Sequence, residues 1–253
     1  RTSPEFALKR LLAAGSGDIY ELGRVFRQGE CGRNHNPEFT MLEWYRTGFD
    51  YQALMTEVAD LVRFCGKDRF QHWPLTRLSY QQLFLNHLDI DPFEAEADAL
   101  KAVANDNGIE TLDLNRRQWL DLLLSLVIQP ALPSNALTFV YDFPVEQAAL
   151  ARVRDGAPPV AERFELYLGQ TELANGYQEL TDAIEQQQRF SDENARRIDN
   201  AQSPYPIDAQ LVNALAHGLP ECAGVALGVD RLLMAIEDCN HLDEVIAFPY
   251  SRA

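Results

Sequence analysis

The sequence is poor in basic residues, and this scarcity argues against one class of partner. Of its 253 residues, 22 are Lys or Arg and 38 are Asp or Glu, so the formal net charge is −16. Proteins that hold a long stretch of nucleic acid usually present clustered Lys and Arg, and no such cluster is evident. The composition therefore predicts no extended nucleic-acid interface, although a local basic site around a phosphate remains compatible with it.

Long apolar runs and closely spaced cysteines are also missing. No apolar run approaches the roughly 20 residues that a membrane-spanning helix needs, and no signal peptide is visible. The chain starts at Arg1 without an initiator Met, so we expect an N-terminal portion to be missing. The cysteines have no metal-ligand spacing and predict a reduced, cytoplasmic protein rather than a disulfide framework or a zinc site. They are Cys31, Cys65, Cys222 and Cys239.

Hydrophobic periodicity predicts an α+β fold with an antiparallel sheet flanked by helices, because hairpin strands are interrupted by helical segments. Residues 67–136 are expected to be mainly helical, with a buried helix at 119–128. The other predicted helices are 50–65, which ends at Gly66, 182–200, a helix through Leu211 and Leu215 that ends at Gly218, and 229–237. The predicted strands are 18–26, 38–46, 138–143, 164–168, 172–180 and 224–227.

The strand at 38–46 carries an unusual face. Phe39, Met41, Glu43 and Tyr45 alternate along it and share one side. A charge buried without a partner on such a face costs roughly several kcal/mol. A cationic ligand or a structural Arg would remove that cost for Glu43. The simpler alternative is an ordinary amphipathic strand with one charge.

The predicted hairpin at 164–180 has a similar polar face, formed by Asn175, Tyr177 and Glu179. Gly176 would allow another group to approach the backbone closely. Glu165 and Glu172 flank the turn, seven residues apart on adjacent strands. Two carboxylates in this arrangement can share a hard cation such as Mg²⁺. A solvated acidic hairpin is the alternative in a chain this acidic.

A strand of small residues runs into the helix at 229–237, which has Arg231 in its first turn. A cation near a helix N-terminus is unfavourable unless an anion lies there too. Asp230 could be that anion, and a bound phosphate is the functional alternative.

These segments together resemble the class II aminoacyl-tRNA synthetases. Residues 24–39 are similar to motif 2 of that family, and residues 224–231 are similar to motif 3. Segments 2–5, 35–43 and 172–176 resemble the lysyl-tRNA synthetase branch. The finer match is to the stand-alone paralogues of that branch that modify elongation factor P. It rests on residues 41–46, 185–190, 224–231, 245–249 and Ala253.

The resemblance implies an ATP-dependent ligase that uses Mg²⁺. Such an enzyme activates (R)-β-lysine as its adenylate and transfers it to a lysine side chain of elongation factor P, without stable tRNA binding. Arg27 and Arg231 are then the catalytic residues. By resemblance, the ATP site consists of Arg27 at the α-phosphate, His35 and Arg231 at the terminal phosphates, Phe39 on adenine, and Glu165 and Glu172 as ligands of Mg²⁺.

A lysine-type substrate carries two ammonium groups, so its site needs two negative receptors. Ala226 stands where synthetases of this branch usually have Gly, and a methyl group there would favour β-lysine over α-lysine. By resemblance, the amino-acid site consists of Glu43, Tyr45 and Glu179 around the side-chain ammonium, Ser3 and Glu5 at the other amine, and Asn175, Tyr177 and Ala226 completing the pocket.

The resemblance also sets expectations for the whole chain. Residues 1–253 should form a class II synthetase-like catalytic domain with no anticodon-binding domain, and motif 1 should lie upstream of Arg1. The family implies a homodimer. Motif 2 departs from the usual pattern, because Gly29 occupies the position of a Glu and the carboxylate comes next, at Glu30.

Two other functions fit the same residues. The chain could be the catalytic core of a lysyl-tRNA synthetase that charges tRNA with lysine. It could also be a non-catalytic paralogue that senses an amino acid, a hypothesis suggested by Gly29. Arg27, Arg231, Glu165 and Glu172 are all present, which favours catalysis over sensing.

Overall fold

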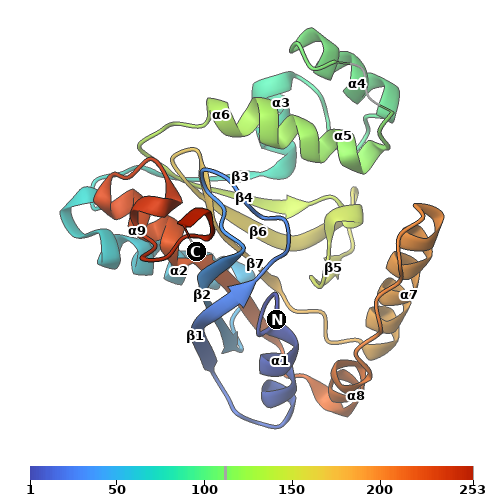
Figure 1. Cartoon of the computed structure of the whole chain (residues 1–253). Helices are drawn as coiled ribbons and strands as arrows, with labels where there is room; N and C mark the ends of the chain where they lie inside the picture. The colour runs from blue at the N-terminus through green and yellow to red at the C-terminus, as the bar shows by residue number, and fades with distance from the viewer. Residues whose placement is uncertain (111–112, 253) are drawn as a thin grey trace.

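An eight-stranded sheet forms the centre of the protein, and helices cover both of its faces (Figure 1). The computed structural model describes residues 1–110 and 113–252. The predicted α+β class is confirmed. The strands are β1 (Ile19–Phe26), β2 (Glu38–Thr47), β3 (Leu75–Ser79), β4 (Leu137–Phe143), β5 (Val153–Arg154), β6 (Val160–Leu168), β7 (Thr171–Gln178) and β8 (Cys222–Gly228).

The spatial order of the strands is β1-β2-β8-β7-β6-β4-β3, and β5 pairs with β6 outside this path. Neighbours are antiparallel except β3 and β4, which are parallel. The sheet is therefore mixed rather than purely antiparallel. The helices are α1 (Glu5–Ala13), α2 (Tyr51–Gly66), α3 (Tyr80–Leu88), α4 (Ala97–Asp106), α5 (Arg116–Leu123), α6 (Gln129–Ala131), α7 (Ala183–Asp199), α8 (Ala209–Gly218) and α9 (Val229–Glu237).

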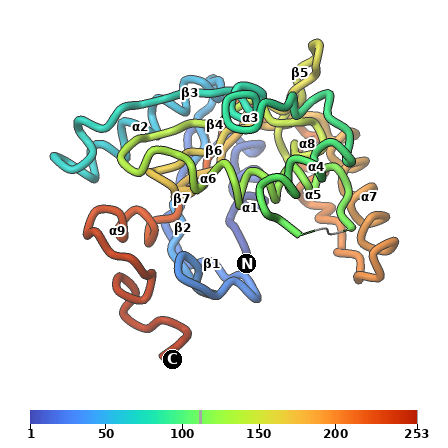
Figure 2. Tube along the Cα trace, turned by 90° about the horizontal axis from the view of Figure 1, so that it is seen from above, coloured from blue at the N-terminus to red at the C-terminus, as the bar shows by residue number. Residues whose placement is uncertain are grey.

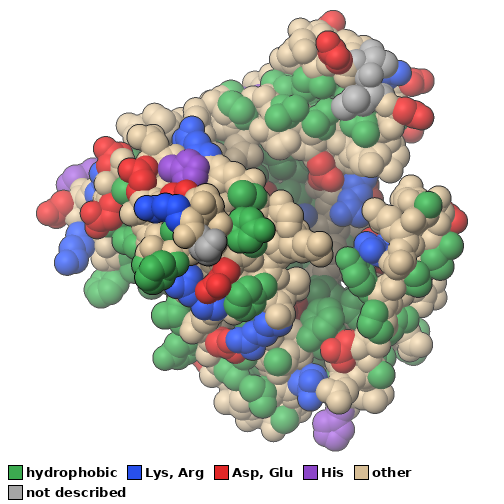
Figure 3. All heavy atoms as spheres, viewed as in Figure 1, with side chains coloured by type: hydrophobic (Ala, Val, Ile, Leu, Met, Phe, Trp, Pro, Cys, Tyr) green, Lys and Arg blue, Asp and Glu red, His purple; other side chains and the backbone are tan. Residues whose placement is uncertain are grey.

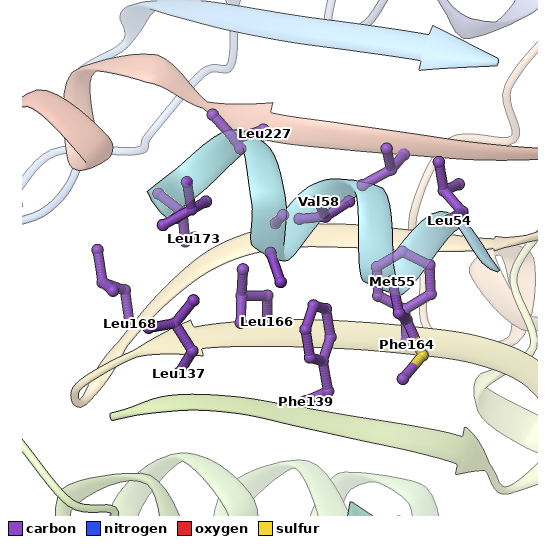
Figure 4. Close-up of a cluster of buried hydrophobic side chains, with 14 of the residues drawn as sticks. Leu54, Met55, Val58, Leu137, Phe139, Phe164, Leu166, Leu168, Leu173 and Leu227 are labelled. Atoms are coloured by element: carbon purple, nitrogen blue, oxygen red, sulfur yellow. The ribbon is translucent and has the colours of Figure 1, made fainter. Parts of the chain in front are cut away.

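Helix α2 covers one face of the sheet. It begins after Asp50, whose side chain accepts a hydrogen bond of 2.7 Å from the Ala53 N–H and so caps the first turn. Leu54 and Val58 are fully buried against Phe164 and other side chains of the strands (Figure 4). Burying an aliphatic side chain of this size contributes about 1.5–3 kcal/mol, so this face anchors the sheet.

Helices α3, α4 and α5 cover the opposite face at the β4–β6 end. Phe139 of β4 points to the α2 core, whereas the next residue, Val140, points to the core formed with α3 and α5. Two-sided burial explains why β4 is apolar almost throughout. Figure 2 shows α7 and α8 on one side of the molecule and α9 with the C-terminal segment on the other.

The prediction that residues 67–136 are mainly helical is wrong for 75–79, which form β3. Thr76 and Arg77 interrupt the apolar residues of this five-residue segment, so the segment has no clear alternation. Its pairing with β4, about sixty residues later, decides its conformation. The predicted helix 119–128 exists but continues as a π-helix over Leu124–Ile128. Residues 111–112 of that stretch, and Ala253, lie outside the described residues.

The register of the three central strands determines which side chains meet. Glu43 of β2 lies opposite Ala226 of β8, and Ala226 lies opposite Asn175 of β7. Residues opposite one another in a sheet point to the same face.

In the described part of the chain, no helix is both long and apolar enough to cross a bilayer.

Candidate active site

Two cavities adjoin on the face of the sheet that carries the predicted functional side chains. The first lies between the 27–36 loop, β7 and α9, and the second lies between α1, β2, β7 and β8. The residues that line both are Arg27, Met41, Asn175 and Ala226.

The second cavity continues outward into a groove along α7. The two share Arg117, Ala149 and Leu150. Figure 3 shows the surface hollowed between the α5 side and the α7 side of the molecule. The second cavity can therefore be reached from this side.

Arg231 is held at the first cavity by three contacts. Its Nη1 donates to the backbone oxygen of Glu172 at 2.8 Å, its Nε to the backbone oxygen of Asn34 at 3.2 Å, and its Nη2 to Nε2 of His35 at 2.7 Å. Burial and the charge of Arg231 lower the pKa of His35, so the imidazole is neutral and accepts this bond. None of these three contacts neutralises the guanidinium.

The carboxylate of Asp230 is hydrogen-bonded to β2 rather than paired with Arg231. Its Oδ2 accepts a hydrogen bond of 2.6 Å from the backbone N–H of Thr40 and so ties α9 to β2. The contacts therefore favour the second of the two sequence alternatives, an anion bound from outside beside Arg231.

Arg27 lies at the junction of the two cavities. Its guanidinium is 5.2 Å from the centre of the Phe39 ring, and its Nε donates to the backbone oxygen of Thr2 at 3.3 Å. Glu30 Oε1 is 3.6 Å from Nη1 of Arg27. The side chain is 40% exposed, so the guanidinium can contact a ligand in either cavity.

The C-terminal segment helps to shape the first cavity. Asn36 is buried, its side-chain amide donates to the backbone oxygen of Glu38 at 2.5 Å, and its Oδ1 accepts from the N–H of Tyr250 at 2.9 Å. The N–H of Leu242 donates to the backbone oxygen of Arg33 at 2.9 Å, and Leu242 itself lines the cavity. The 33–36 loop is thus fastened to residues 242–250.

Glu165 and Glu172 lie close to one another on β6 and β7. Burial, followed by the charge of Glu165, raises the pKa of Glu172 to about 7. Glu165 forms an ion pair with Arg163 and accepts a 2.6 Å hydrogen bond from Tyr167 Oη. Glu172 lines the first cavity. A cation between the two carboxylates would relieve their repulsion.

Among the described residues, no group of three or more His, Cys, Asp or Glu side chains is arranged around a common metal position. The two carboxylates could therefore supply only part of a coordination shell. Mg²⁺ usually keeps several waters and takes one or two carboxylates together with substrate phosphates. The donor set fits that ion.

In the second cavity, Glu43 is buried and held by two hydroxyl donors. Ser3 Oγ donates to Oε2 at 2.7 Å, and Tyr45 Oη donates to Oε1 at 2.6 Å. Burial raises the pKa of Glu43, against the effect of the Tyr45 hydrogen bond. The prediction that Phe39, Met41, Glu43 and Tyr45 share a functional face fits their positions, since all four line one cavity or both.

A second polar cluster of this cavity centres on Lys9, which the sequence analysis missed. Lys9 Nζ is 2.8 Å from Glu5 Oε1 and 2.5 Å from Glu179 Oε2. Tyr177 Oη also donates to Glu5 Oε1, at 2.6 Å. In sequence, Lys9 precedes Arg10 in a charged helix and resembles a solvent-exposed residue. The one available signal was its i, i+4 spacing from Glu5.

Two glycines allow these side chains to meet. A Cβ at Gly224 would lie 2.3 Å from Glu179 Oε1 and 2.4 Å from Cε1 of Tyr45. A Cβ at Gly176 would lie 2.6 Å from Cζ of Phe164. The prediction of a close approach at Gly176 is therefore confirmed, and Gly224 has the same role beside the cavity.

The chain matches the family of class II tRNA synthetases (D, K and N) over residues 1–252. The chain belongs to that family. It is 49% identical to the elongation factor P–(R)-β-lysine ligase of Vibrio vulnificus and 50% identical to that of Vibrio cholerae, over all of this chain and 78% of each relative. It is 49% identical to the ligase of Yersinia enterocolitica over all of this chain and 77% of that protein. The resemblance inferred from the motifs is confirmed.

The backbone conformation accounts for the departure in motif 2. Gly29 has a φ of +82°, a conformation that is strained for residues other than Gly. A Glu at this position would therefore be costly. The carboxylate near Arg27 is supplied by the next residue, Glu30, which lines the first cavity.

Proposed function

We propose that this protein uses ATP to activate (R)-β-lysine and transfers the β-lysyl group to a lysine side chain of elongation factor P. The observation that carries the proposal is the meeting of two cavities at Arg27. One offers cationic and aromatic side chains to a nucleotide, and the other offers buried carboxylates to ammonium groups. The relatives, which are named elongation factor P–(R)-β-lysine ligases, support the same assignment.

In the first step, a carboxylate oxygen of β-lysine attacks the α-phosphorus of ATP. The bond from that phosphorus to the bridging oxygen breaks, and pyrophosphate leaves. Such reactions depend on positioning and charge stabilisation. We assign Arg27 to the α-phosphate, Arg231 and His35 to the terminal phosphates, and Phe39 to adenine.

Glu165 and Glu172 would hold Mg²⁺. When bound, the ion would neutralise phosphate charge and orient the polyphosphate chain. The adjacent Arg163 already engages Glu165, which keeps the carboxylate oriented.

In the second step, the neutral ε-amine of the acceptor lysine attacks the carbonyl carbon of the adenylate. The bond from that carbon to the phosphate oxygen breaks, AMP leaves, and the amine loses a proton as the amide forms. The acceptor lysine would reach the adenylate through the groove along α7, which continues the second cavity.

We assign the two ammonium groups of the substrate to the second cavity. Glu43, Tyr45 and Glu179 would surround the side-chain ammonium, and Ser3 and Glu5 would face the other amine. Asn175, Tyr177 and Ala226 complete the walls. The hydroxyls of Ser3 and Tyr45 now donate to Glu43, and an ammonium could replace or supplement these bonds.

We further propose a homodimer that acts in the cytoplasm and binds no tRNA stably. Strand β1 lies at one end of the sheet, and its side chains Tyr20, Leu22 and Phe26 are 72%, 58% and 51% exposed. An exposed apolar edge strand of this kind supports an interface with another chain. The four free thiols support a reducing compartment. Light scattering of the whole protein tests the dimer.

The test of the proposed activity supplies labelled β-lysine and ATP with either elongation factor P or lysine tRNA. We expect label on the protein and far less on the tRNA. Efficient charging of tRNA would instead favour a lysyl-tRNA synthetase core. Absence of ATP–pyrophosphate exchange with every lysine isomer would favour an amino-acid sensor.

A further inference from the structure

Lys9 is a buried cation beside the second cavity. Its side chain is 2% exposed, and its ammonium lies between carboxylates of two elements, Glu5 of α1 and Glu179 at the end of β7. Its Nζ is also 5.5 Å from the centre of the Tyr177 ring. Glu5 and Glu179 line the cavity, whereas Lys9 lies behind them.

The charges of this region match a substrate with two ammonium groups. Glu5, Glu43 and Glu179 are the carboxylates of the second cavity. When all three are ionised, their charges and that of Lys9 sum to −2, which complements a substrate with two ammonium groups. Without Lys9 there would be a third, uncompensated buried carboxylate, which is a costly arrangement in a protein interior.

We propose that Lys9 is a positioning residue that holds Glu5 and Glu179 in place and favours the carboxylate form of Glu179, so that the two side chains can receive the two ammonium groups of the substrate. The proposal rests on the proposed function, since it concerns the same pocket. It gives Lys9 no direct contact with the substrate.

The groups that face Lys9 support this role. Burial opposes a charge on Lys9, but Glu179 and Glu5 outweigh burial and raise its pKa. Burial and the charges of Glu5 and Glu43 raise the pKa of Glu179 to about 8, although Lys9 lowers it. Without Lys9 the pKa of this carboxyl would be higher still.

The remaining titratable neighbours of the cluster cannot replace the ammonium. Burial raises the pKa of Tyr45 and of Tyr177, and it raises the pKa of Cys222 to about 12. All three are neutral near pH 7. Among these contacts, Lys9 is thus the cation that faces Glu179, and its removal should raise the pKa of Glu179 further.

The experiment is titration calorimetry of β-lysine binding to the whole protein, in two buffers of different ionisation enthalpy and across pH 7–9. Lys9→Met should release more protons on binding than the wild type at the same pH. Its affinity should fall about tenfold for each pH unit below the raised carboxyl pKa. Lys9→Arg, which keeps the charge, should bind and release protons as the wild type does.

Arg10→Met is the matched control, because it removes an exposed charge from the same helix. If Lys9→Met does not fold, Lys9→Gln takes its place, since an amide head can still donate to one carboxylate. A loss of affinity that is the same at every pH, with unchanged proton release, would overturn the proposal. If the wild type does not bind β-lysine, the proposed function fails, and the same titration with α-lysine tests Lys9 separately. Binding of neither isomer would overturn both.

Discussion

Glu43 on β2 and Ala226 on β8 are direct partners in the sheet, and both line the second cavity. The methyl group of Ala226 therefore lies on the same face of the sheet as the side chain of Glu43, which we assign to the substrate ammonium. It also lies opposite Asn175 on its other side. A single methyl group at this point occupies space between two polar walls of the pocket.

Ala226→Gly should relax the preference for β-lysine toward α-lysine. One methylene in a pocket changes discrimination by roughly 10–200-fold, and we expect a change within that range. The measurement is kcat/KM for both isomers in the two proteins. An unchanged ratio would mean that Ala226 does not determine the choice of isomer.

Arg27→Ala and Arg231→Ala should each reduce ATP–pyrophosphate exchange on the order of 10²–10³-fold, because each removes a charged donor from the proposed phosphate site. Both side chains reach a cavity rather than the core, so both variants should fold. Arg231→Ala should unfold at a somewhat lower temperature, because it loses the hydrogen bonds to Glu172, Asn34 and His35. Arg24→Ala is the control, since Arg24 pairs with Glu38 at 3.7 Å and is 52% exposed. Exchange near the wild-type rate in either variant would contradict the proposed mechanism.

Mg²⁺ binding should depend on pH through Glu172. The pKa of this carboxyl is raised to about 7, so it is mainly protonated below pH 7 and a poor ligand there. The affinity of the protein for Mg²⁺ with ATP should therefore rise between pH 6 and pH 8. Glu172→Gln should bind Mg²⁺ more weakly and lose this dependence. A pH-independent affinity in the wild type would argue against Glu172 as a ligand.

Gly224→Ala should disturb the second cavity and leave the first largely unchanged. The added methyl group would overlap Glu179 and Tyr45, and overpacking costs roughly 1–3 kcal/mol. We expect a lower unfolding temperature and a raised KM for β-lysine, with a smaller change in the KM for ATP. Gly32→Ala is the stability control, since a Cβ there meets no atom within 4 Å. A wild-type KM for β-lysine in Gly224→Ala would show that this strand tolerates the methyl group.

Strand alternation was enough to predict which side chains of β2 share a face, because Phe39 to Tyr45 follow a two-residue period. Alternation also predicted the hairpin of β6 and β7, although β6 begins at Val160 and β7 ends at Gln178. The helix predicted at 229–237 has these bounds in the structure. The motifs indicated the family. Local patterns of this kind depend on neighbours in sequence, which are visible in a single chain.

What could not be predicted depends on residues far apart in sequence. The conformation of 75–79 is determined by β4, and the burial of Lys9 is determined by Glu179, 170 residues away. The register that aligns Glu43, Ala226 and Asn175 is likewise a property of three strands together. Hydrophobic periodicity carries no information about which charged residue of a helix will be enclosed.

Asn36 joins the loop of the first cavity to Tyr250, and Leu242 both binds that loop and lines the cavity. The loop and residues 242–250 thus form one wall made of two distant pieces of chain. If this wall moves, the 33–36 loop and residues 242–250 should move together. A substitution in 242–250 should consequently alter the first cavity, to which we assign the nucleotide, although we assign neither Asn36 nor Tyr250 a part in the chemistry.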